Sequence, residues 1–146
     1  MLENLDIGRQ EPRSFPDGTP APAWTIDKLF TLFPNLREMP DRLGGHMSGG
    51  EQQMLTVART LMGNPRLILL DEPSEGVAPI IIDAMADMMI ALKQTGVAIV
   101  LSEQNLPFAE LVCDHAYIIE KGEMRFSGSM QDLSANEELR RAYLEV

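Results

Sequence analysis

The sequence is poor in several features that mark whole classes of protein. Cys113 is the only cysteine among 146 residues, so no intramolecular disulfide can form, as is usual in a reducing cytosol. Only 12 lysines and arginines stand against 22 acids, and a net charge of −10 disfavours nucleic acid as the main partner. Apolar runs reach about five residues, whereas a membrane-spanning helix needs roughly 20. The first residues also lack the apolar core of a signal peptide.

Prolines are concentrated near the N-terminus. Residues Gly8–Ala23 contain Pro12, Pro16, Pro20 and Pro22. Proline removes a backbone donor and biases the preceding residue away from helix. This stretch is therefore predicted to be an exposed linker.

Beyond the linker, the apolar pattern alternates between helix and strand. Unbroken apolar runs predict buried strands at residues 67–70 and 97–101, the first covered on both faces as in a parallel sheet. Lys121-Gly122 predicts a hairpin between residues 116–120 and 123–127. The alternation is that of an α/β domain with a mainly parallel sheet. Helices are predicted at residues 24–33, 48–62, 79–93, 105–113 and 134–143.

The first strand ends in Asp71-Glu72-Pro73. Sheets of α/β proteins bind ligands at the carboxyl ends of their strands. At such an end Asp71 can hold Mg²⁺, directly or through water, beside a nucleotide. Glu72 can accept a proton from an attacking water. The motif alone is a weak signal, because a plain polar strand end or a helix cap has the same residues.

The second helix opens with Ser48-Gly49-Gly50-Glu51, which fits a capping box with Ser48 at the N-cap. Free backbone N–H groups and the helix dipole attract an anion there, and the glycines allow its close approach. These residues therefore form a candidate phosphate site. An ordinary N-cap is the alternative.

The two motifs together are far more specific than either alone. A Ser-Gly-Gly-Glu turn, one helix, the break at residues 63–65 and LILLDEP resemble the ATP-binding-cassette (ABC) ATPases, whose signature precedes the Walker B strand by one helix. The signature is residues 47–51 and Walker B is residues 67–71, with Glu72 at the catalytic glutamate position. EPSEG-x-AP and SEQN are similar to the ATP-binding subunits of branched-chain amino acid importers, with relatives in urea and amide uptake.

The resemblance implies an incomplete ABC-type nucleotide-binding domain. Residues 1–62 would be part of the helical subdomain, with the linker at 8–23 and the signature. Residues 63–146 would be the Walker B-containing part of the α/β core, with the C-terminal half of the sheet, a hairpin and a terminal helix.

The resemblance also implies roles for individual residues. Asp71 would organise Mg²⁺, Glu72 would activate water, and Gln104 would stand at the switch position. ATP and Mg²⁺ are the implied cofactors. The implied partners are membrane permease subunits and a second ATPase subunit, identical or different, at the cytoplasmic face of the membrane, with no membrane span of its own and no nucleic acid. The implied contacts to ATP on the opposite subunit come from Ser48, Gly49, Gly50 and Glu51.

Two positions depart from the family pattern. Ala78 replaces the usual D-loop aspartate, which puts in doubt its contact across a dimer. Gln104 replaces a histidine that contacts the γ-phosphate; glutamine still donates a hydrogen bond but cannot become a cation. His46 and His115 lie elsewhere and are expected to be structural or exposed.

A phosphate-binding loop is missing, since none of the eleven glycines begins GxxxxGK[ST]. The resemblance places that loop, the adenine-stacking aromatic and the Mg²⁺-sensing glutamine before the helix that MLENL resembles. Met1 then corresponds to an internal position, and a truncated gene, a mis-assigned start and a deliberate fragment all fit. We expect the chain alone neither to bind nor to hydrolyse ATP appreciably, which leaves open whether it is an enzyme. We also expect the strand at 67–70 to have an unpaired, apolar edge that promotes aggregation.

Two other functions fit parts of the sequence. A catalytically dead remnant would act only as a permease- or subunit-binding module, and a stop codon or frameshift upstream would favour it. DNA-repair and chromosome-structural ATPases also use a Ser-Gly-Gly-Glu signature. The acidic composition and the lack of coiled-coil heptads argue against that class.

Overall fold

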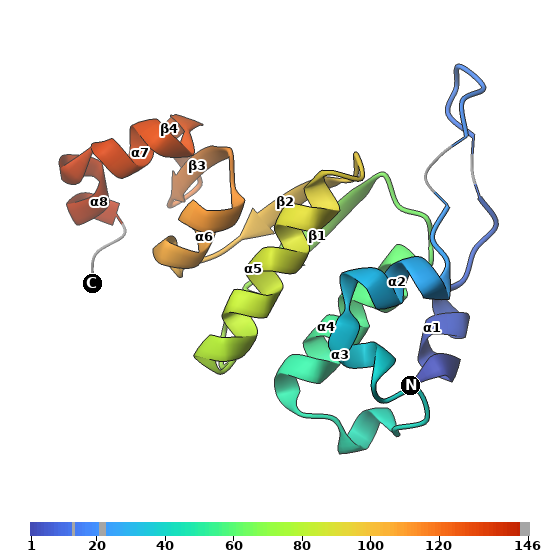
Figure 1. The fold of residues 1–146 in the computed structure, drawn as a ribbon. Helices are drawn as coiled ribbons and strands as arrows, with labels where there is room; N and C mark the ends of the chain where they lie inside the picture. Colours follow the sequence, from blue (N-terminus) through green and yellow to red (C-terminus); the bar gives the residue numbers. More distant parts are fainter. Residues whose placement is uncertain (13, 21–22, 144–146) are drawn as a thin grey trace.

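The computed structural model describes residues 1–12, 14–20 and 23–143 (Figure 1). The first helices are α1 (Leu2–Gly8), α2 (Ile26–Leu32), α3 (Pro34–Arg37), the 3₁₀ turn η1 (Gly44–His46) and α4 (Gly49–Leu61). They are followed by β1 (Leu67–Asp71), α5 (Pro79–Lys93), β2 (Ala98–Ser102) and α6 (Leu106–Val112). The last elements are β3 (His115–Glu120), β4 (Glu123–Ser129), α7 (Met130–Ala135) and α8 (Glu137–Tyr143).

The predicted capping and turn signals are confirmed. Glu51 Oε2 accepts the Ser48 N–H at 2.7 Å, and Ser48 Oγ accepts the Glu51 N–H at 3.4 Å, which completes the capping box of α4. Pro79 opens α5, and the hairpin turns at Lys121 and Gly122. Both turn residues have left-handed backbones, with φ of +51° and +81°, as a tight two-residue hairpin turn requires.

One helix was not predicted, and one helix prediction needs correction. The helix at residues 24–33 does end before Pro34, but Pro34 then opens the short helix α3, because proline suits a first helical position. The single terminal helix is divided into α7 and α8 at Asn136, whose Oδ1 accepts the Leu139 N–H at 3.1 Å and caps α8.

The predicted linker begins one residue too early, because Gly8 is the last residue of α1. Its residues from 9 to 12, from 14 to 20 and at 23 contain no helix or strand, only an isolated bridge between Ser14 and Pro20. They are mostly exposed. Arg13, Ala21 and Pro22 lie outside the described residues.

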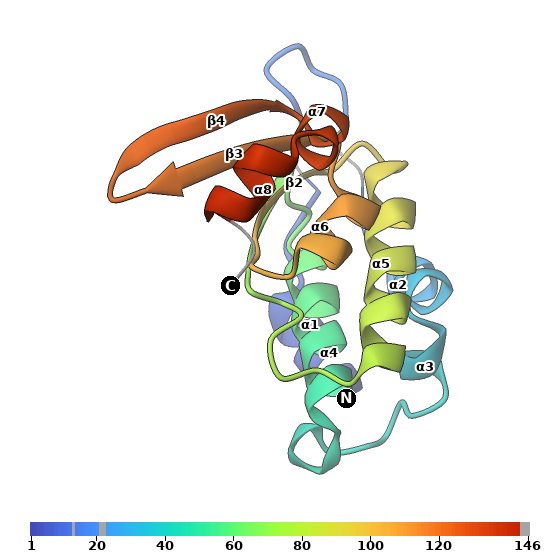
Figure 2. The same cartoon turned by 90° about the vertical axis from the view of Figure 1, so that its left-hand side faces the viewer.

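The parallel sheet has two strands, which differs from the prediction. β1 and β2 pair from Leu67–Ala98 to Asp71–Ser102, and α5 lies on one side of the pair (Figures 1 and 2). Ile68 is 2% exposed, but Leu69 on the opposite face is 72% exposed. The prediction that residues 67–70 are covered on both faces is therefore wrong, because helices cover only one.

The hairpin forms a second sheet, so the fold is mixed α/β with one small parallel and one small antiparallel sheet. β3 and β4 do not join β1 and β2, and no further strand pairs with β1 in the described chain. The free edge expected for this strand is therefore present. The single, mainly parallel sheet that was predicted is not found in the described residues.

Two hydrophobic cores hold these elements. The larger joins the helices to the parallel pair and includes Phe33, Leu61, Met89 and Phe108. It contains residues from both 1–62 and 63–146. The smaller core lies between the hairpin, α6 and α7, at one end of the molecule (Figures 1 and 2).

We expect the bare face of β1 and β2 to drive self-association, because Leu67, Leu69 and Val100 expose apolar side chains beside an unpaired strand edge. Leu69→Lys should shift the protein toward the monomer in sedimentation velocity experiments over a concentration series. Leu111→Lys is the control, since Leu111 is also 61% exposed but lies on α6. Equal association of the two variants would contradict this expectation.

Candidate functional site

The carboxyl ends of β1 and β2 carry the first group of candidate residues. Asp71 is exposed at the end of β1, and its register partner is Ser102. Pairing continues for one residue, since the Glu72 N–H donates to the Ser102 carbonyl at 2.8 Å. The backbone of Glu72 then enters the left-handed region, with φ +43°, which is uncommon for a residue with a side chain. The chain therefore turns sharply at Glu72, out of the line of the strand.

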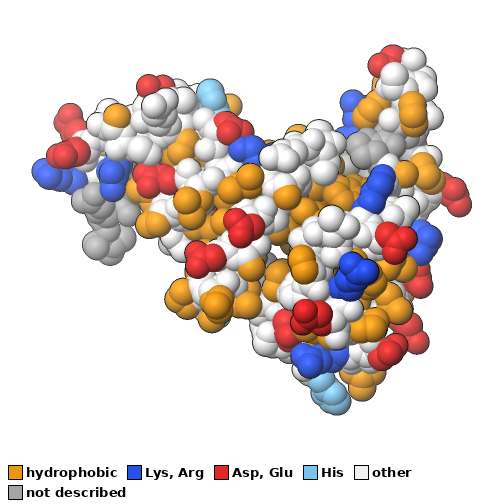
Figure 3. Space-filling model, viewed as in Figure 1, with side chains coloured by type: hydrophobic (Ala, Val, Ile, Leu, Met, Phe, Trp, Pro, Cys, Tyr) orange, Lys and Arg blue, Asp and Glu red, His pale blue; other side chains and the backbone are white. Residues whose placement is uncertain are grey.

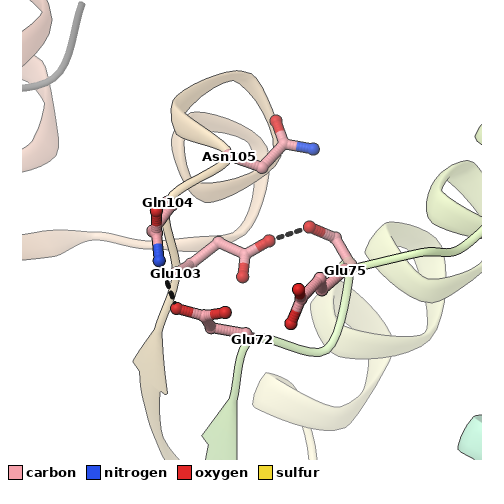
Figure 4. A pocket seen from close by; sticks show the side chains of 6 residues that line it. Glu72, Glu75, Glu103, Gln104 and Asn105 are labelled. Carbon is pink, nitrogen blue, oxygen red and sulfur yellow. Dashed lines mark hydrogen bonds between the residues drawn. The ribbon is translucent and has the colours of Figure 1, made fainter. Parts of the chain in front are cut away.

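Side chains from the two strand ends meet at this turn (Figure 4). Gln104 Nε2 donates a hydrogen bond to Glu72 Oε1, and Ser74 Oγ donates to Glu103 Oε1. The structure thus brings Asp71, Glu72 and Gln104 to one edge of the sheet, as parallel pairing requires. An open pocket of about 280 Å³ is lined by Glu72, Ser74, Glu75, Glu103, Gln104 and Asn105.

Glu103 is a residue of this pocket to which the sequence analysis gave no role. Partial burial raises the pKa of its carboxyl, and the neighbouring Glu72 and Glu75 carboxylates raise it further, while a hydrogen bond from the Ser74 backbone opposes the shift. The available signal was its position, one residue past the end of β2 and directly before Gln104. Three carboxylates therefore meet at one small opening.

The raised pKa of Glu103 makes stability depend on pH. The folded state binds this proton more tightly than the unfolded state, so its contribution is full below the ordinary glutamate pKa and is lost as pH rises through the folded value. We expect Glu103→Gln to be more stable than the parent at pH 7, with a difference that shrinks toward pH 4. Urea midpoints across that range measure it. A pH-independent difference would show that Glu103 does not titrate as described.

The second group lies at the start of α4. Ser48 Oγ accepts the Glu51 N–H, which leaves the hydroxyl hydrogen for an acceptor outside the helix. The Ser48 backbone N–H, and to a smaller extent the Ser48 side chain and the Arg42 charge, lower the pKa of Glu51. The Glu51 carboxylate is therefore occupied by the cap.

The two glycines of this turn differ in their surroundings. A Cβ at Gly49 would meet nothing within 4 Å, whereas a Cβ at Gly50 would lie 2.5 Å from Cγ2 of Ile81. Gly50 is thus required for packing against the first turn of α5. Apolar side chains also reach the surface at that end of α5 (Figure 3). Only Gly49 leaves open space above the helix start.

The two groups are not joined within the described chain, since no hydrogen bond or ion pair links Ser48–Glu51 to Asp71, Glu72 or Gln104. The residues fit a Mg²⁺–nucleotide better than Mg²⁺ alone. No cluster of three or more His, Cys, Asp or Glu residues suited to a metal exists in the described residues, but Mg²⁺ often takes one or two carboxylates and completes its shell with phosphate oxygens. His46 and His115 are exposed.

Comparison with known proteins gives matches to ATP-binding proteins of ABC transporters. The family model described as ABC transporter matches residues 3–75. The chain is 44% identical over 119 residues to the high-affinity branched-chain amino acid transport ATP-binding protein BraG of Pseudomonas aeruginosa, covering 82% of this chain and 51% of BraG. It is 34% identical over 118 residues to the lipopolysaccharide export system ATP-binding protein LptB of Haemophilus influenzae, covering 81% and 48%. The chain thus spans about half the length of these relatives.

The fold is shared with solved structures. An ATP-binding cassette of an ABC transporter superposes with a TM-score of 0.74 at 24% identity, over 99% of this chain and 62% of that one. In the described part of this chain, no helix is long and apolar enough to cross a membrane.

Proposed function

The chain belongs to the ABC transporter family, as an ATP-binding protein, and we propose that it acts in an importer for branched-chain amino acids or related small solutes. One observation carries the proposal. A single chain holds a helix start with open space at Gly49 and a separate strand end with Asp71, Glu72 and Gln104. The name of BraG supports the substrate class. LptB, which this chain resembles over 118 residues, is named for lipopolysaccharide export, so substrate choice depends on more than this chain.

The geometry suggests what each group does. The Ser48 hydroxyl and the first N–H groups of α4 would bind phosphate oxygens, and the absence of a link to the strand ends favours a phosphate carried by a second subunit. ATP with Mg²⁺ supplies the phosphoryl group and the charge that offsets its oxygens. Asp71 would bind the Mg²⁺ beside that phosphoryl group. Glu72 would take a proton from water, with its carboxylate oriented by Gln104.

The proposal includes partners and a location. The chain would pair with a second ATPase subunit and dock on a membrane permease from the cytoplasmic side. Residues 1–62 would act as the helical portion and residues 63–146 as the Walker B portion. Because the sequence has no phosphate-binding loop, the chain alone is expected to be inactive.

Complementation tests this function. BraG with its own signature serine replaced by arginine serves as the second subunit, so turnover requires the signature of this chain. We expect neither protein alone to hydrolyse Mg-ATP and the mixture to do so. Ser48→Ala should lower this turnover at least tenfold, because it removes the phosphate donor. A tenfold loss corresponds to about 1.4 kcal/mol, the order expected for a charge-assisted hydrogen bond.

Ser129→Ala is the matched control, since Ser129 is also an N-cap serine and accepts the Asp132 N–H at 3.0 Å. It removes an N-cap hydrogen bond of the same kind without touching the proposed phosphate site. Turnover that survives Ser48→Ala would contradict the proposal. A mixture that associates but stays silent would favour the catalytically dead binding module instead. Turnover by the chain alone, lost on Glu72→Gln, would refute its expected inactivity.

A further inference from the structure

We propose that Glu103 is a positioning residue, which through Ser74 ties the turn after β1 to the turn after β2 and so holds Glu72 against Gln104. The role in turnover rests on the proposed function, but the coupling between the two turns does not. Neither residue of the Ser74–Glu103 pair belongs to the chemistry assigned above.

Two hydrogen bonds between the turns form the coupling (Figure 4). Ser74 on the first turn donates to Glu103 on the second, whereas Gln104 on the second donates to Glu72 on the first. The two bonds therefore join the same two turns and run in opposite directions. The bonded residues of the first turn, 72 and 74, are two positions apart, and those of the second turn, 103 and 104, are adjacent. Neither turn can move away without breaking both.

Ser74 is unusually well fixed for a polar residue in a turn. It is 8% exposed, and Pro73 before it is fully buried. The Val77 N–H donates to the Ser74 carbonyl at 3.3 Å, and the Glu75 N–H donates to the Glu72 carbonyl at 3.1 Å. Ser74 is thus anchored by the core on one side and offers its hydroxyl to Glu103 on the other.

The left-handed backbone at Glu72 explains why such an anchor is needed. A side-chain-bearing residue in this region costs free energy, and it persists only where the surroundings enforce it. The enforcing contacts are the Glu72 N–H to Ser102, the short turn to Glu75, and the Ser74–Glu103 bond next to it. Loss of the last should let the turn relax and draw the Glu72 carboxylate away from Gln104.

Charge makes the coupling adjustable. The groups that act on the charge of Glu103 are the carboxylates of Glu72 and Glu75, and Glu103 in turn acts on Cys113, directly after α6. None of these groups is a cation, so none compensates an ionised Glu103. Glu103→Gln keeps an oxygen acceptor for Ser74 and removes the repulsion. The effect of the hydrogen bond can therefore be measured apart from the effect of the charge.

Hydrogen exchange on the 146-residue chain at low concentration tests the coupling without nucleotide. We expect Ser74→Ala and Glu103→Ala each to speed exchange in the peptide covering residues 72–78 about fivefold, the factor that one net hydrogen bond confers. The double variant should add little, because both remove the same bond. Glu103→Gln should retain protection at pH 7 and abolish the pH dependence of protection seen in the parent, which a purely steric role would not do.

Ser134 and Glu110 provide matched controls, because Ser134 Oγ donates to Glu110 Oε1 at 2.7 Å in the same kind of pair elsewhere. Ser134→Ala should leave residues 72–78 unchanged. Exchange in α4, residues 49–61, reports whether the larger core of a variant is still folded. If Glu103→Ala unfolds, the comparison of Ser74→Ala with Glu103→Gln tests the coupling instead. Unchanged exchange in Ser74→Ala, or additive effects in the double variant, overturns the proposal. A positive exchange result with no turnover in the BraG mixture would refute the proposed function and leave the coupling intact.

Discussion

We expect Glu72→Gln to abolish nearly all ATP turnover when the chain is supplied with a phosphate-binding loop. The suitable protein is a chimera that joins the N-terminal half of BraG to this chain. The proposed role of Glu72 is to accept a proton from the attacking water, and a general base typically contributes about 100- to 10,000-fold in rate. Glutamine keeps the size of the side chain and can still pair with Gln104, but it cannot take the proton.

The loss should appear in kcat, with little change in KM, because the carboxylate acts on water and not on nucleotide binding. Glu75→Gln is the matched control, since it removes the same charge from the same pocket at a residue to which we assign no chemistry. We expect less than a threefold change for it. Retention of more than a tenth of the activity in Glu72→Gln would show that another group activates the water.

Gly50→Ala is expected to destabilise the fold by about 1–3 kcal/mol, the usual cost of overpacking. The added methyl would stand 2.5 Å from Cγ2 of Ile81, where something must move. Because α4 and α5 both contribute to the larger core, the two helices would separate at their first turns. Urea denaturation followed by helical circular dichroism measures the loss.

Two further variants make this prediction sharp. Gly49→Ala adds the same methyl one residue earlier, where nothing lies within 4 Å, and should be neutral or slightly stabilising. Ile81→Ala should recover part of the stability lost by Gly50→Ala, because it removes the atoms that clash. The prediction fails if the two glycine variants are equally stable. In the complementation assay we expect Gly49→Ala to lower ATP turnover more than Gly50→Ala does, since only Gly49 faces the open space proposed for phosphate.

The sequence predicted those features that depend on neighbouring residues. Ser48 and Glu51 cap α4 reciprocally, Pro79 opens α5, and Lys121-Gly122 turns the hairpin, because each signal acts within a few residues. The meeting of Glu72 and Gln104 was also predictable, because parallel strands bring their carboxyl ends to the same edge.

The errors concern relations that no local signal encodes. Leu67 and Leu69 have the apolar pattern of a strand covered on both faces, but whether anything covers the second face depends on other elements. The hairpin's separation from β1 and β2 is likewise a matter of sheet order. Ser74 lies in the EPSEG motif and Glu103 in the SEQN motif, and only the structure brings their side chains together.

The existence of two cores has a consequence for how unfolding is observed. Trp24 is the only tryptophan and belongs to the larger core, whereas Ile118, Met130 and Leu133 form the smaller one. The two regions are candidates for separate cooperative units with different opening free energies. Tryptophan fluorescence would then report the melting of the helices and the parallel pair, and the release of the hairpin would leave that signal unchanged.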